Sequence, residues 1–101
     1  PWIVLADMVP DYRALTLTTR LNGEVVQQAG LSDLIFDLPA LISYITTFTP
    51  LAPGDVIVSG TPEGVGAYRK PPLWMRAGDK VEVEVSGIGI LANPIVDEAD
   101  A

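Results

Sequence analysis

The sequence predicts a mainly β domain of the α+β class, with about six short strands and one amphipathic helix. Two stretches, residues 15–21 and 80–85, alternate between apolar and polar side chains, as half-buried antiparallel strands do. The dipeptide Asn22-Gly23 separates two strand-like runs and is a strong hairpin signal. Only one segment has helical periodicity, so the helical crossovers that a parallel sheet needs are missing.

The first half of the chain is expected to contain three strands. Residues 2–9 form an apolar run that ends at Pro10-Asp11, which is the pattern of a strand followed by a turn. Residues 15–21 and 24–28 are expected to form the two arms of the Asn22-Gly23 hairpin. The second arm alternates less cleanly than the first, so its buried face is left open.

One amphipathic helix is expected over residues 38–48. Asp37 stands where an N-cap side chain can accept a hydrogen bond, and Pro39 is tolerated in a first turn. Burial of the apolar face against a sheet contributes roughly 1.5–3 kcal/mol for each aliphatic side chain, before the entropy cost. The apolar positions at helical spacing are Leu38, Leu41, Ile42 and Ile45.

The second half begins with a short strand, residues 55–58, which its β-branched composition predicts to be buried. A glycine-rich loop over residues 59–66 follows, and then an irregular stretch with two consecutive prolines. In residues 80–85 three valines alternate with Glu82 and Glu84, so valines and glutamates face opposite sides. A Ser86-Gly87 turn is expected to return the chain and place Ile88 and Ile90 beside the valines.

Composition and charge argue against several classes of function. The 101 residues carry a net charge of −7 with only six Lys and Arg, which disfavours nucleic-acid binding. No apolar run approaches the ~20 residues of a membrane-spanning helix. The absence of cysteine excludes disulfides and thiolate zinc sites and favours the cytoplasm. Without histidine, a general base must be a perturbed carboxylate or lysine, or must lie elsewhere.

The first residue suggests that the chain has a precursor. Pro1 does not start a translated chain, and it leads at once into the strand-like residues 2–9 without a cap or turn. We therefore expect residues 1–101 to be processed, or to be the C-terminal part of something longer.

The loop SGTPEGVG, residues 59–66, is the main candidate for chemistry. It lacks the Lys-Ser/Thr ending of a P-loop, its glycines do not fit G-x-G-x-x-G, and no helix pattern follows, so nucleotide binding is disfavoured. Glycines at the end of a strand let main-chain N–H groups approach a ligand, and the Thr61 hydroxyl lies beside Gly60. One interpretation is a cradle for a carboxylate or enolate oxygen. From the pattern alone, a tight turn whose glycines only satisfy positive φ is favoured, because most glycine-rich turns have no further role.

The carboxylates give weaker signals. Glu82 and Glu84 share one face of a strand and have the oxygen ligands that a hard cation prefers, but the valine alternation favours a solvated face. Glu63 in the loop is interpreted as a solvated turn residue rather than a base. Trp74 and Met75 are interpreted as a plug of the core, with an apolar patch for a partner as the alternative. We assign no catalytic and no metal-ligating residue in this chain.

Five segments together resemble the C-terminal half of the fumarylacetoacetate hydrolase family, in the same order and over nearly the whole chain. The most specific are PGDVIVSGTPEGVG and KPPLWMRAGDKVEVEVSGIG, and the others are LNGEVVQ, LSDLIFDLPALISYIT and ILANPIVDE. Within the family the chain is most similar to the bacterial branch of 2-hydroxyhepta-2,4-diene-1,7-dioate and 5-carboxymethyl-2-hydroxymuconate isomerases.

The resemblance implies a partial β-roll of the family's own type, usually dimeric. It also implies hydrolysis, decarboxylation or isomerisation of β-diketo and other 2-oxo acids of aromatic catabolism. A Mg²⁺ or Ca²⁺ ion in such enzymes stabilises the negative charge that develops on the substrate. By the same resemblance, Thr61 and Gly60 bind substrate oxygens.

One departure from the family pattern concerns the metal. The family's ligands, a Glu-x-Glu pair and a later aspartate, precede the position of Pro1. Residues 1–101 are therefore expected to be the C-terminal portion of the catalytic domain, inactive alone, in a homodimer or joined to the missing N-terminal portion. The alternative is a non-catalytic β-rich module that associates with a partner chain carrying those carboxylates.

Overall fold

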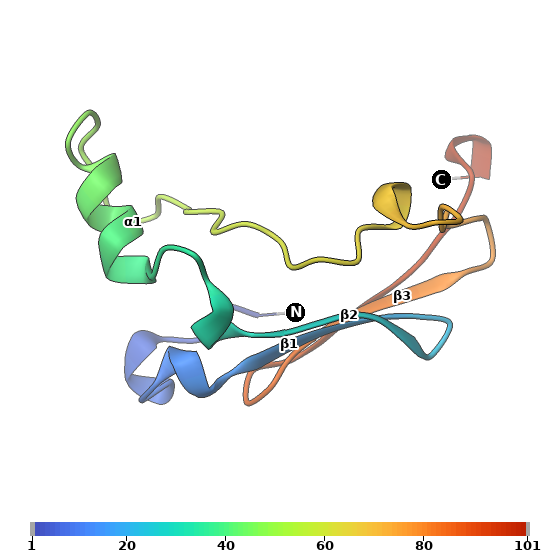
Figure 1. The fold of residues 1–101 in the computed structure, drawn as a ribbon, viewed down its shortest axis with the longest axis horizontal. Helices are drawn as coiled ribbons and strands as arrows, with labels where there is room; N and C mark the ends of the chain where they lie inside the picture. The colour runs from blue at the N-terminus through green and yellow to red at the C-terminus, as the bar shows by residue number, and fades with distance from the viewer. Residues whose placement is uncertain (1, 101) are drawn as a thin grey trace.

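The structure, a computed structural model, describes residues 2–100 and contains two β-hairpins joined into one antiparallel sheet, with one α-helix beside it (Figure 1). The mainly β, α+β class is thereby confirmed. The inference about Pro1 falls outside the described residues. The strands are β1 (Thr16–Leu21), β2 (Glu24–Gly30), β3 (Lys80–Val85) and β4 (Gly89–Pro94), and the helix is α1 (Leu38–Ile45). Short 3₁₀ turns lie at Ala6–Met8, Tyr12–Ala14, Leu31–Asp33, Gly66–Tyr68 and Glu98–Asp100.

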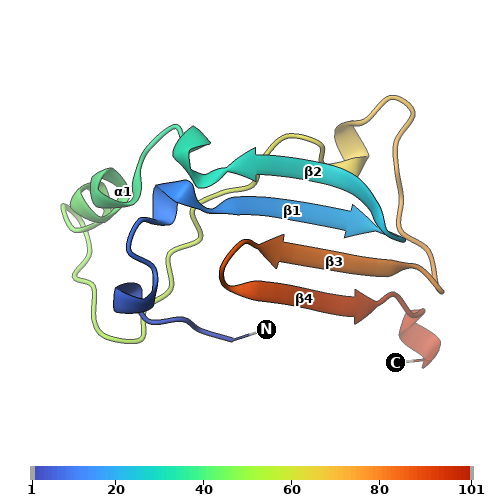
Figure 2. The ribbon, with the colours of Figure 1, turned by 90° about the horizontal axis from the view of Figure 1, so that it is seen from below.

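The sheet has the order β2-β1-β3-β4, so hairpins that are far apart in the sequence meet at its centre (Figure 2). There β1 runs antiparallel to β3, with Leu17 opposite Val85 and Leu21 opposite Val81. Paired residues of an antiparallel ladder share a face. The leucines of β1 and the valines of β3 therefore form one apolar face of the sheet.

The first hairpin is confirmed, and the pairing of its two strands contains a shift in register. Asn22 and Gly23 form the turn with φ of 52° and 86°, as the dipeptide predicts. The pairing of β1 with β2 then shifts, because Gln27 lies opposite Thr19 while Val25 lies opposite Arg20. Val26 is thus the extra residue of a β-bulge, which explains the imperfect alternation of this arm.

Asn22 also fastens this turn to the start of β3. Its side chain donates to Asp79 Oδ1 at 2.9 Å and accepts from the Lys80 N–H at 2.9 Å. The hydrogen bond from the Asn22 side chain, followed by the one from the Arg76 main chain, lowers the pKa of the Asp79 carboxyl below its ordinary value. The ionised Asp79 therefore stabilises the fold above the unfolded-state pKa of 3.8, and this contribution is lost as the pH falls through the folded-state pKa.

Replacement of Asn22 by alanine is expected to raise the pKa of Asp79 toward its ordinary value. The variant also loses the bond to Lys80 and the tolerance of asparagine for positive φ, so its free energy of unfolding at neutral pH should fall by about 1 kcal/mol. A ¹³C carboxyl titration of the protein, together with denaturant unfolding, measures both effects. An unchanged Asp79 pKa in the variant would contradict this account.

The second hairpin is confirmed, but the predicted positions of Ile88 and Ile90 beside the valines are wrong. The turn between β3 and β4 keeps Val83 opposite Leu91 and Glu84 opposite Ile90. Because side chains alternate along a strand, Ile90 lies on the face of the glutamates and Leu91 takes its expected place beside the valines. Ile88 lies in the turn, where its N–H donates to the Val85 carbonyl oxygen at 3.0 Å, and β4 begins at Gly89, opposite Val85.

Helix α1 begins as predicted and ends three residues early. The Asp37 side chain accepts from the Ala40 N–H at 2.9 Å, and a proline occupies the first turn. Beyond Ile45, the hydroxyls of Thr46 and Thr47 donate to main-chain carbonyl oxygens of the last turn. These bonds satisfy carbonyl groups that a longer helix would have used.

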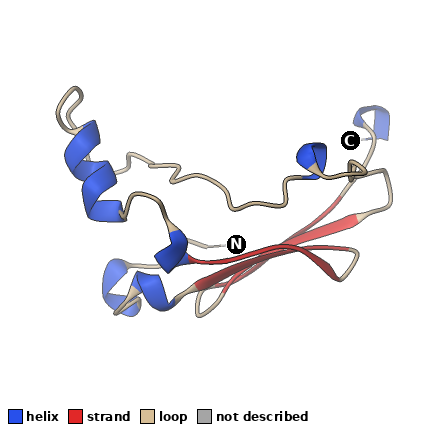
Figure 3. Ribbon diagram, in the orientation of Figure 1, coloured by secondary structure: helices blue, strands red, loops and turns tan. Residues whose placement is uncertain are grey.

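Two predicted strands are absent from the described residues. Residues 2–5 have no regular structure and residues 6–8 form a 3₁₀ turn. Residues 55–58 contain no paired strand, and Val56 and Val58 are 85% and 87% exposed rather than buried. The connection from α1 to β3 instead crosses above one face of the sheet as an extended loop (Figure 3). A strand requires a neighbouring strand, and the described residues offer none to these two segments.

The chain does not close around a core. No apolar side chain among residues 2–99 is buried, and the most enclosed residue is Thr18, at 6% exposure. The accessible surface is 7927 Å², against about 5,500 Å² for a compact protein of this mass. The radius of gyration is 16.0 Å, against about 13 Å for a compact chain of this length. No helix within residues 2–100 has the length and hydropathy to cross a bilayer.

Candidate functional site

The Thr61 loop, defined here as residues 60–64, lies over the edge strand β2 on the apolar face of the sheet. It is attached by the side-chain amide of Gln27, whose Nε2 lies 3.0 Å from the Pro62 carbonyl oxygen and 3.3 Å from that of Glu63. The same nitrogen lies 3.4 Å from Thr61 Oγ1. Gln27 pairs with Thr19 on the ladder, so its side chain rises on the face of Leu17 and Thr19.

A second side chain holds the far end of the loop. Arg69 Nε donates to the Gly64 carbonyl oxygen at 3.0 Å, and Arg69 Nη2 donates to the Val26 carbonyl oxygen. Val26 is the bulged residue of β2, so its carbonyl group is free of the regular ladder and available to the guanidinium. The bulge is therefore connected with both side chains that hold the loop. Gln27 follows the bulged residue in β2, and Arg69 binds the carbonyl group of that residue.

Two glycines of the loop, Gly60 and Gly64, meet different structural requirements. Gly60 has φ of +114°, and a Cβ atom there meets nothing within 4 Å, so it is required by conformation and faces open space. Gly64 has φ of +98°, and a Cβ atom there would lie 2.6 Å from the Val26 carbonyl oxygen. Gly64 thus permits close packing on β2, while the space beside Gly60 is open.

A cavity of about 740 Å³ opens in front of Gly60 and Thr61. This volume falls in the range that small-molecule sites usually have, and the combination of apolar walls with a few polar groups is also typical of such sites. The polar end is formed by residues 59–63, including the exposed Thr61. The rest of the wall is mainly apolar and comes from β1, the end of β2, residues 31–36 and α1. Its polar side chains are those of Gln28 and Asp33, and its other members are Leu17, Ala29, Gly30, Leu31, Leu34, Ile35, Phe36, Leu38 and Leu41.

The Thr61 hydroxyl remains able to donate a hydrogen bond into this cavity. Its oxygen accepts from Gln27 Nε2, and none of the described residues accepts its proton. A hydroxyl has one donor and two acceptor sites, so acceptance from Gln27 leaves the O–H free. The main-chain N–H groups of the loop form no main-chain hydrogen bonds within the described residues. The corner of the cavity therefore holds a hydroxyl donor, and the carboxylates of Asp33 and Glu63 also line the cavity.

A smaller cavity of about 390 Å³ lies on the other side of Gln27, against Gly64, Tyr68 and Arg69. Glu63 lines both cavities, so the loop forms a wall between them. Glu63 is exposed, as expected of a turn residue.

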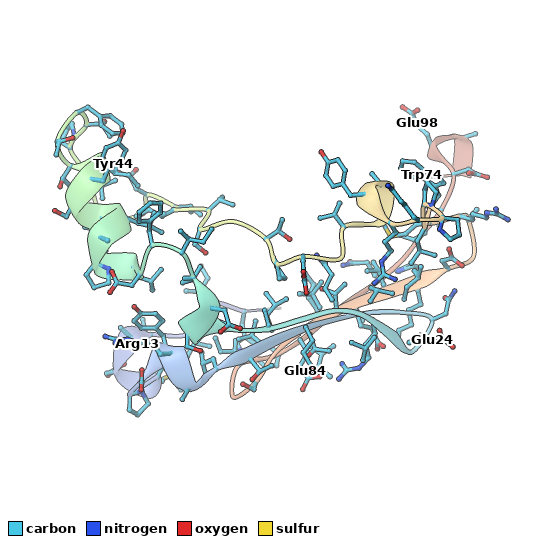
Figure 4. The ribbon with its side chains drawn as sticks, viewed as in Figure 1. Arg13, Glu24, Tyr44, Trp74, Glu84 and Glu98 are labelled. Atoms are coloured by element: carbon cyan, nitrogen blue, oxygen red, sulfur yellow. The ribbon has the colours of Figure 1, made fainter. Side chains whose placement is uncertain are left out.

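The described residues do not form a metal site. No group of three or more potential ligands comes together within residues 2–100. Glu84 pairs with Arg20 at 2.6 Å and Glu82 with Lys80 at 2.7 Å, and both glutamates are half-buried rather than fully solvated. Glu84 points away from the side of the sheet on which the long connection lies (Figure 4).

Two apolar residues on the connection before β3, Trp74 and Met75, do not lie where the sequence analysis expected them. Trp74 and Met75 are 63% and 55% exposed, so they do not plug a core in this structure. They form part of the exposed apolar surface, as in the alternative interpretation.

The sequence pointed to Gly60 and Thr61, and it missed the side chains that contact their loop. Gln27 looked like one of two ordinary glutamines on a strand, and Arg69 like a residue of an irregular stretch. The imperfect alternation of residues 24–28 was the available signal, because β-bulges often lie next to functional sites and redirect side chains there.

The fold and the loop define a class: an antiparallel sheet with one helix and a glycine-rich connection across one face is part of the fumarylacetoacetate-hydrolase-type fold. Residues 1–96 match the family model described as fumarylacetoacetate (FAA) hydrolase C-terminal, and the chain belongs to this family. The family resemblance of the five sequence segments is confirmed.

Three known proteins that are similar to this chain are a tautomerase, an isomerase and a hydrolase. The oxaloacetate tautomerase fahd2, mitochondrial, of Xenopus laevis is 41% identical over 96 residues, which cover 95% of this chain and 30% of that protein. The crystal structure of 5-carboxymethyl-2-hydroxymuconate delta-isomerase from Mycobacterium smegmatis is 42% identical, with a TM-score of 0.73 over 85% of this chain and 32% of its own. Maleylpyruvate hydrolase from Sphingobium sp. SYK-6, in complex with manganese(II) and pyruvate, is 35% identical, with a TM-score of 0.82 over 94% of this chain and 33% of its own.

The chain spans about a third of the length of these relatives. The family includes hydrolases and isomerases, and the similarity to an enzyme acting on 5-carboxymethyl-2-hydroxymuconate agrees with the branch that the sequence resembles.

Proposed function

We propose that residues 1–101 are the C-terminal portion of the catalytic domain of a metal-dependent enzyme acting on 2-oxo acids of aromatic catabolism. In this proposal Thr61 and Gly60 bind an oxygen of the substrate carboxylate or enolate. The reaction is hydrolysis, isomerisation or decarboxylation, and the whole protein works in the cytoplasm as a homodimer. The remainder of the active site comes from the portion of the protein that precedes residue 1.

The single observation that supports this role is the exposed Thr61 hydroxyl at the polar end of a mainly apolar cavity of about 740 Å³. Apolar walls exclude water from a bound organic acid and strengthen each remaining hydrogen bond. The hydroxyl and the main-chain N–H groups beside Gly60 would donate to an oxyanion, which stabilises negative charge as it develops. The apolar wall would hold the carbon skeleton of the substrate.

The substrate class follows from what the relatives' substrates have in common. Oxaloacetate, maleylpyruvate and 5-carboxymethyl-2-hydroxymuconate, named for the three relatives, each carry a carboxylate next to an oxo or enol oxygen. Such a pair of oxygens chelates a divalent cation and also accepts hydrogen bonds. We propose that this shared part of the molecule lies at Thr61, and that the variable part lies against the apolar wall.

The proposed metal ion is Mg²⁺ or Ca²⁺, held by residues outside this chain. The manganese(II) in the Sphingobium relative supports a divalent ion in a site of this kind. When bound, the ion would supply positive charge against the substrate oxygens. The part played by residues 60–61 is to orient those oxygens by hydrogen bonding.

The function is tested by an activity screen of the full-length protein. Oxaloacetate tautomerisation, 5-carboxymethyl-2-hydroxymuconate isomerisation and maleylpyruvate hydrolysis are followed by absorbance, with Mg²⁺, Ca²⁺ or Mn²⁺ added and with EDTA as the control. We expect turnover of at least one substrate that EDTA abolishes. Absence of turnover on all three, with no binding of oxalate as an enolate mimic, would contradict the proposal.

A non-catalytic module is the second candidate, and the open apolar surface favours it over an independent domain. A chain with no buried apolar side chain among residues 2–99 requires association with more protein. The two candidates differ in whether the associated protein, together with this chain, turns over a 2-oxo acid.

A further inference from the structure

We propose that Gln27 is a positioning residue for Thr61, holding its hydroxyl oriented toward the substrate. This inference rests on the proposed function of Thr61. Gln27 lies on β2, outside the loop and 34 residues away in the sequence. Its side chain contacts the loop, but we assign it no direct contact with the substrate.

The loop depends on side chains for its shape. Residues 56–64 form no main-chain to main-chain hydrogen bond within the described part of the chain. The side-chain bonds to the loop come from Gln27, which reaches Thr61, Pro62 and Glu63, and from Arg69, which reaches Gly64. Gln27 is therefore the anchor at the end of the loop that carries the hydroxyl, and Arg69 is the anchor at the opposite end.

The position of Gln27 results from the β-bulge at Val26. The bulge adds one residue between Val25, opposite Arg20, and Gln27, opposite Thr19. Without that extra residue, the side chains of β2 on one side of the bulge would point to the opposite face of the sheet. The bulge thus lets the strand keep its pairing near the turn while Gln27 faces the loop.

The hydrogen bond to Thr61 has a direct chemical consequence. An amide N–H that donates to Oγ1 occupies one acceptor site of the oxygen and leaves the hydroxyl proton for another partner. A hydroxyl that accepts one hydrogen bond becomes a better donor in the next, because chains of hydrogen bonds polarise one another. Gln27 is also uncharged, so it directs the hydroxyl without adding a charge near an anionic ligand.

Asn93 provides a control in the same sheet. It lies on β4 opposite Val81, is exposed, and lines neither cavity. Asn93→Leu removes a side-chain amide from the sheet, as Gln27→Leu does, but it leaves the contacts of the Thr61 loop in place. The neighbouring Gln28 is unsuitable as a control because it lines both cavities.

The experiment is a double-mutant cycle in the full-length enzyme. The variants are Gln27→Leu, Thr61→Val, their combination, and Asn93→Leu as the control. The readouts are kcat, KM and the Kd of oxalate, with thermal melting as a check on folding. Gln27→Met keeps the approximate length of the side chain, removes its N–H donors and adds no charge, so it repeats the test if the leucine variant does not fold.

We expect Gln27→Leu to lower kcat/KM roughly tenfold, the effect of one lost hydrogen bond of about 1.4 kcal/mol, and to change the same kinetic parameter as Thr61→Val. In the Thr61→Val background the same change should cost less than about twofold, because its target is already gone. Asn93→Leu should leave kcat/KM within about twofold of wild type.

Two results would overturn the inference while leaving the function of Thr61 intact. One is an unchanged kcat/KM in both Gln27 variants when Thr61→Val is impaired. The other is an equal loss from Gln27→Leu in both backgrounds, which would indicate a general structural effect. If Thr61→Val itself has no effect, the proposed function fails and this inference fails with it.

Discussion

Replacement of Thr61 by valine in the full-length enzyme is expected to lower kcat/KM by roughly 5- to 150-fold, through loss of about 1–3 kcal/mol of hydrogen bonding to the substrate oxygen. Valine keeps the branched shape of threonine and replaces only the hydroxyl by a methyl group. The loss is large because the substrate oxygen would face that methyl group in a cavity with mainly apolar walls, where water replaces the missing bond poorly. Steady-state kinetics on the substrate identified by the activity screen measures the change.

Two further variants make this result specific. Thr61→Ser restores a hydroxyl at the same position and should recover most of the lost kcat/KM. Thr49→Val makes the same chemical change at an exposed threonine that follows α1 and does not line the cavity, and it should leave kcat/KM near wild type. Wild-type kinetics in Thr61→Val, with the active protein correctly folded, would remove Thr61 from the site.

The second large effect concerns the chain by itself. Purified residues 1–101 are expected to show no detectable turnover, to bind the apolar dye ANS, and to self-associate in size-exclusion chromatography. The physical reason is the exposed apolar surface, since Val56, Val58 and Trp74 are each more than half exposed. The extended residues 56–58 also present unpaired main-chain groups, which favour pairing with another strand.

Addition of the preceding portion of the full-length protein should reverse these properties. We expect a complex that no longer binds ANS and that turns over the substrate in the presence of a divalent ion. A complex that forms but remains inactive would favour the non-catalytic module. A monomeric, dye-free and active chain of 101 residues would contradict both readings of the fold.

The parts of the fold that local sequence determines were predictable. The Asn22-Gly23 turn has the positive φ angles that the dipeptide tolerates, and the Asp37 side chain caps α1 as its position indicated. Both features depend on residues within a few positions of each other. The end of α1 was less predictable, because the hydroxyls of Thr46 and Thr47 compete for its last carbonyl groups.

The parts that depend on distant partners were not predictable. Val56 and Val58 have the composition of a buried strand, yet no strand within residues 2–100 pairs with them. Composition reports what a segment can form, while pairing depends on what lies beside it. The face of Ile90 was wrong for a related reason, because the length of a turn decides the register and a shift of one residue reverses the face.

The candidate site shows the same contrast between local and distant residues. Gly60 and Thr61 were predicted to bind substrate from the loop chemistry and the family resemblance, and in the structure both line a cavity. Gln27 was missed because its contact with the loop spans 34 residues and depends on a bulge. A local pattern can show that alternation is broken, but it does not show where the redirected side chain points.

The most direct test of the account is a crystal structure of the full-length protein with Mn²⁺ and pyruvate. The account predicts the Thr61 Oγ1 within about 3 Å of a pyruvate oxygen, with Gln27 Nε2 still donating to the same hydroxyl. Pyruvate bound to the metal ion with Thr61 turned away from it, or with the cavity in front of Thr61 filled by protein, would contradict the account.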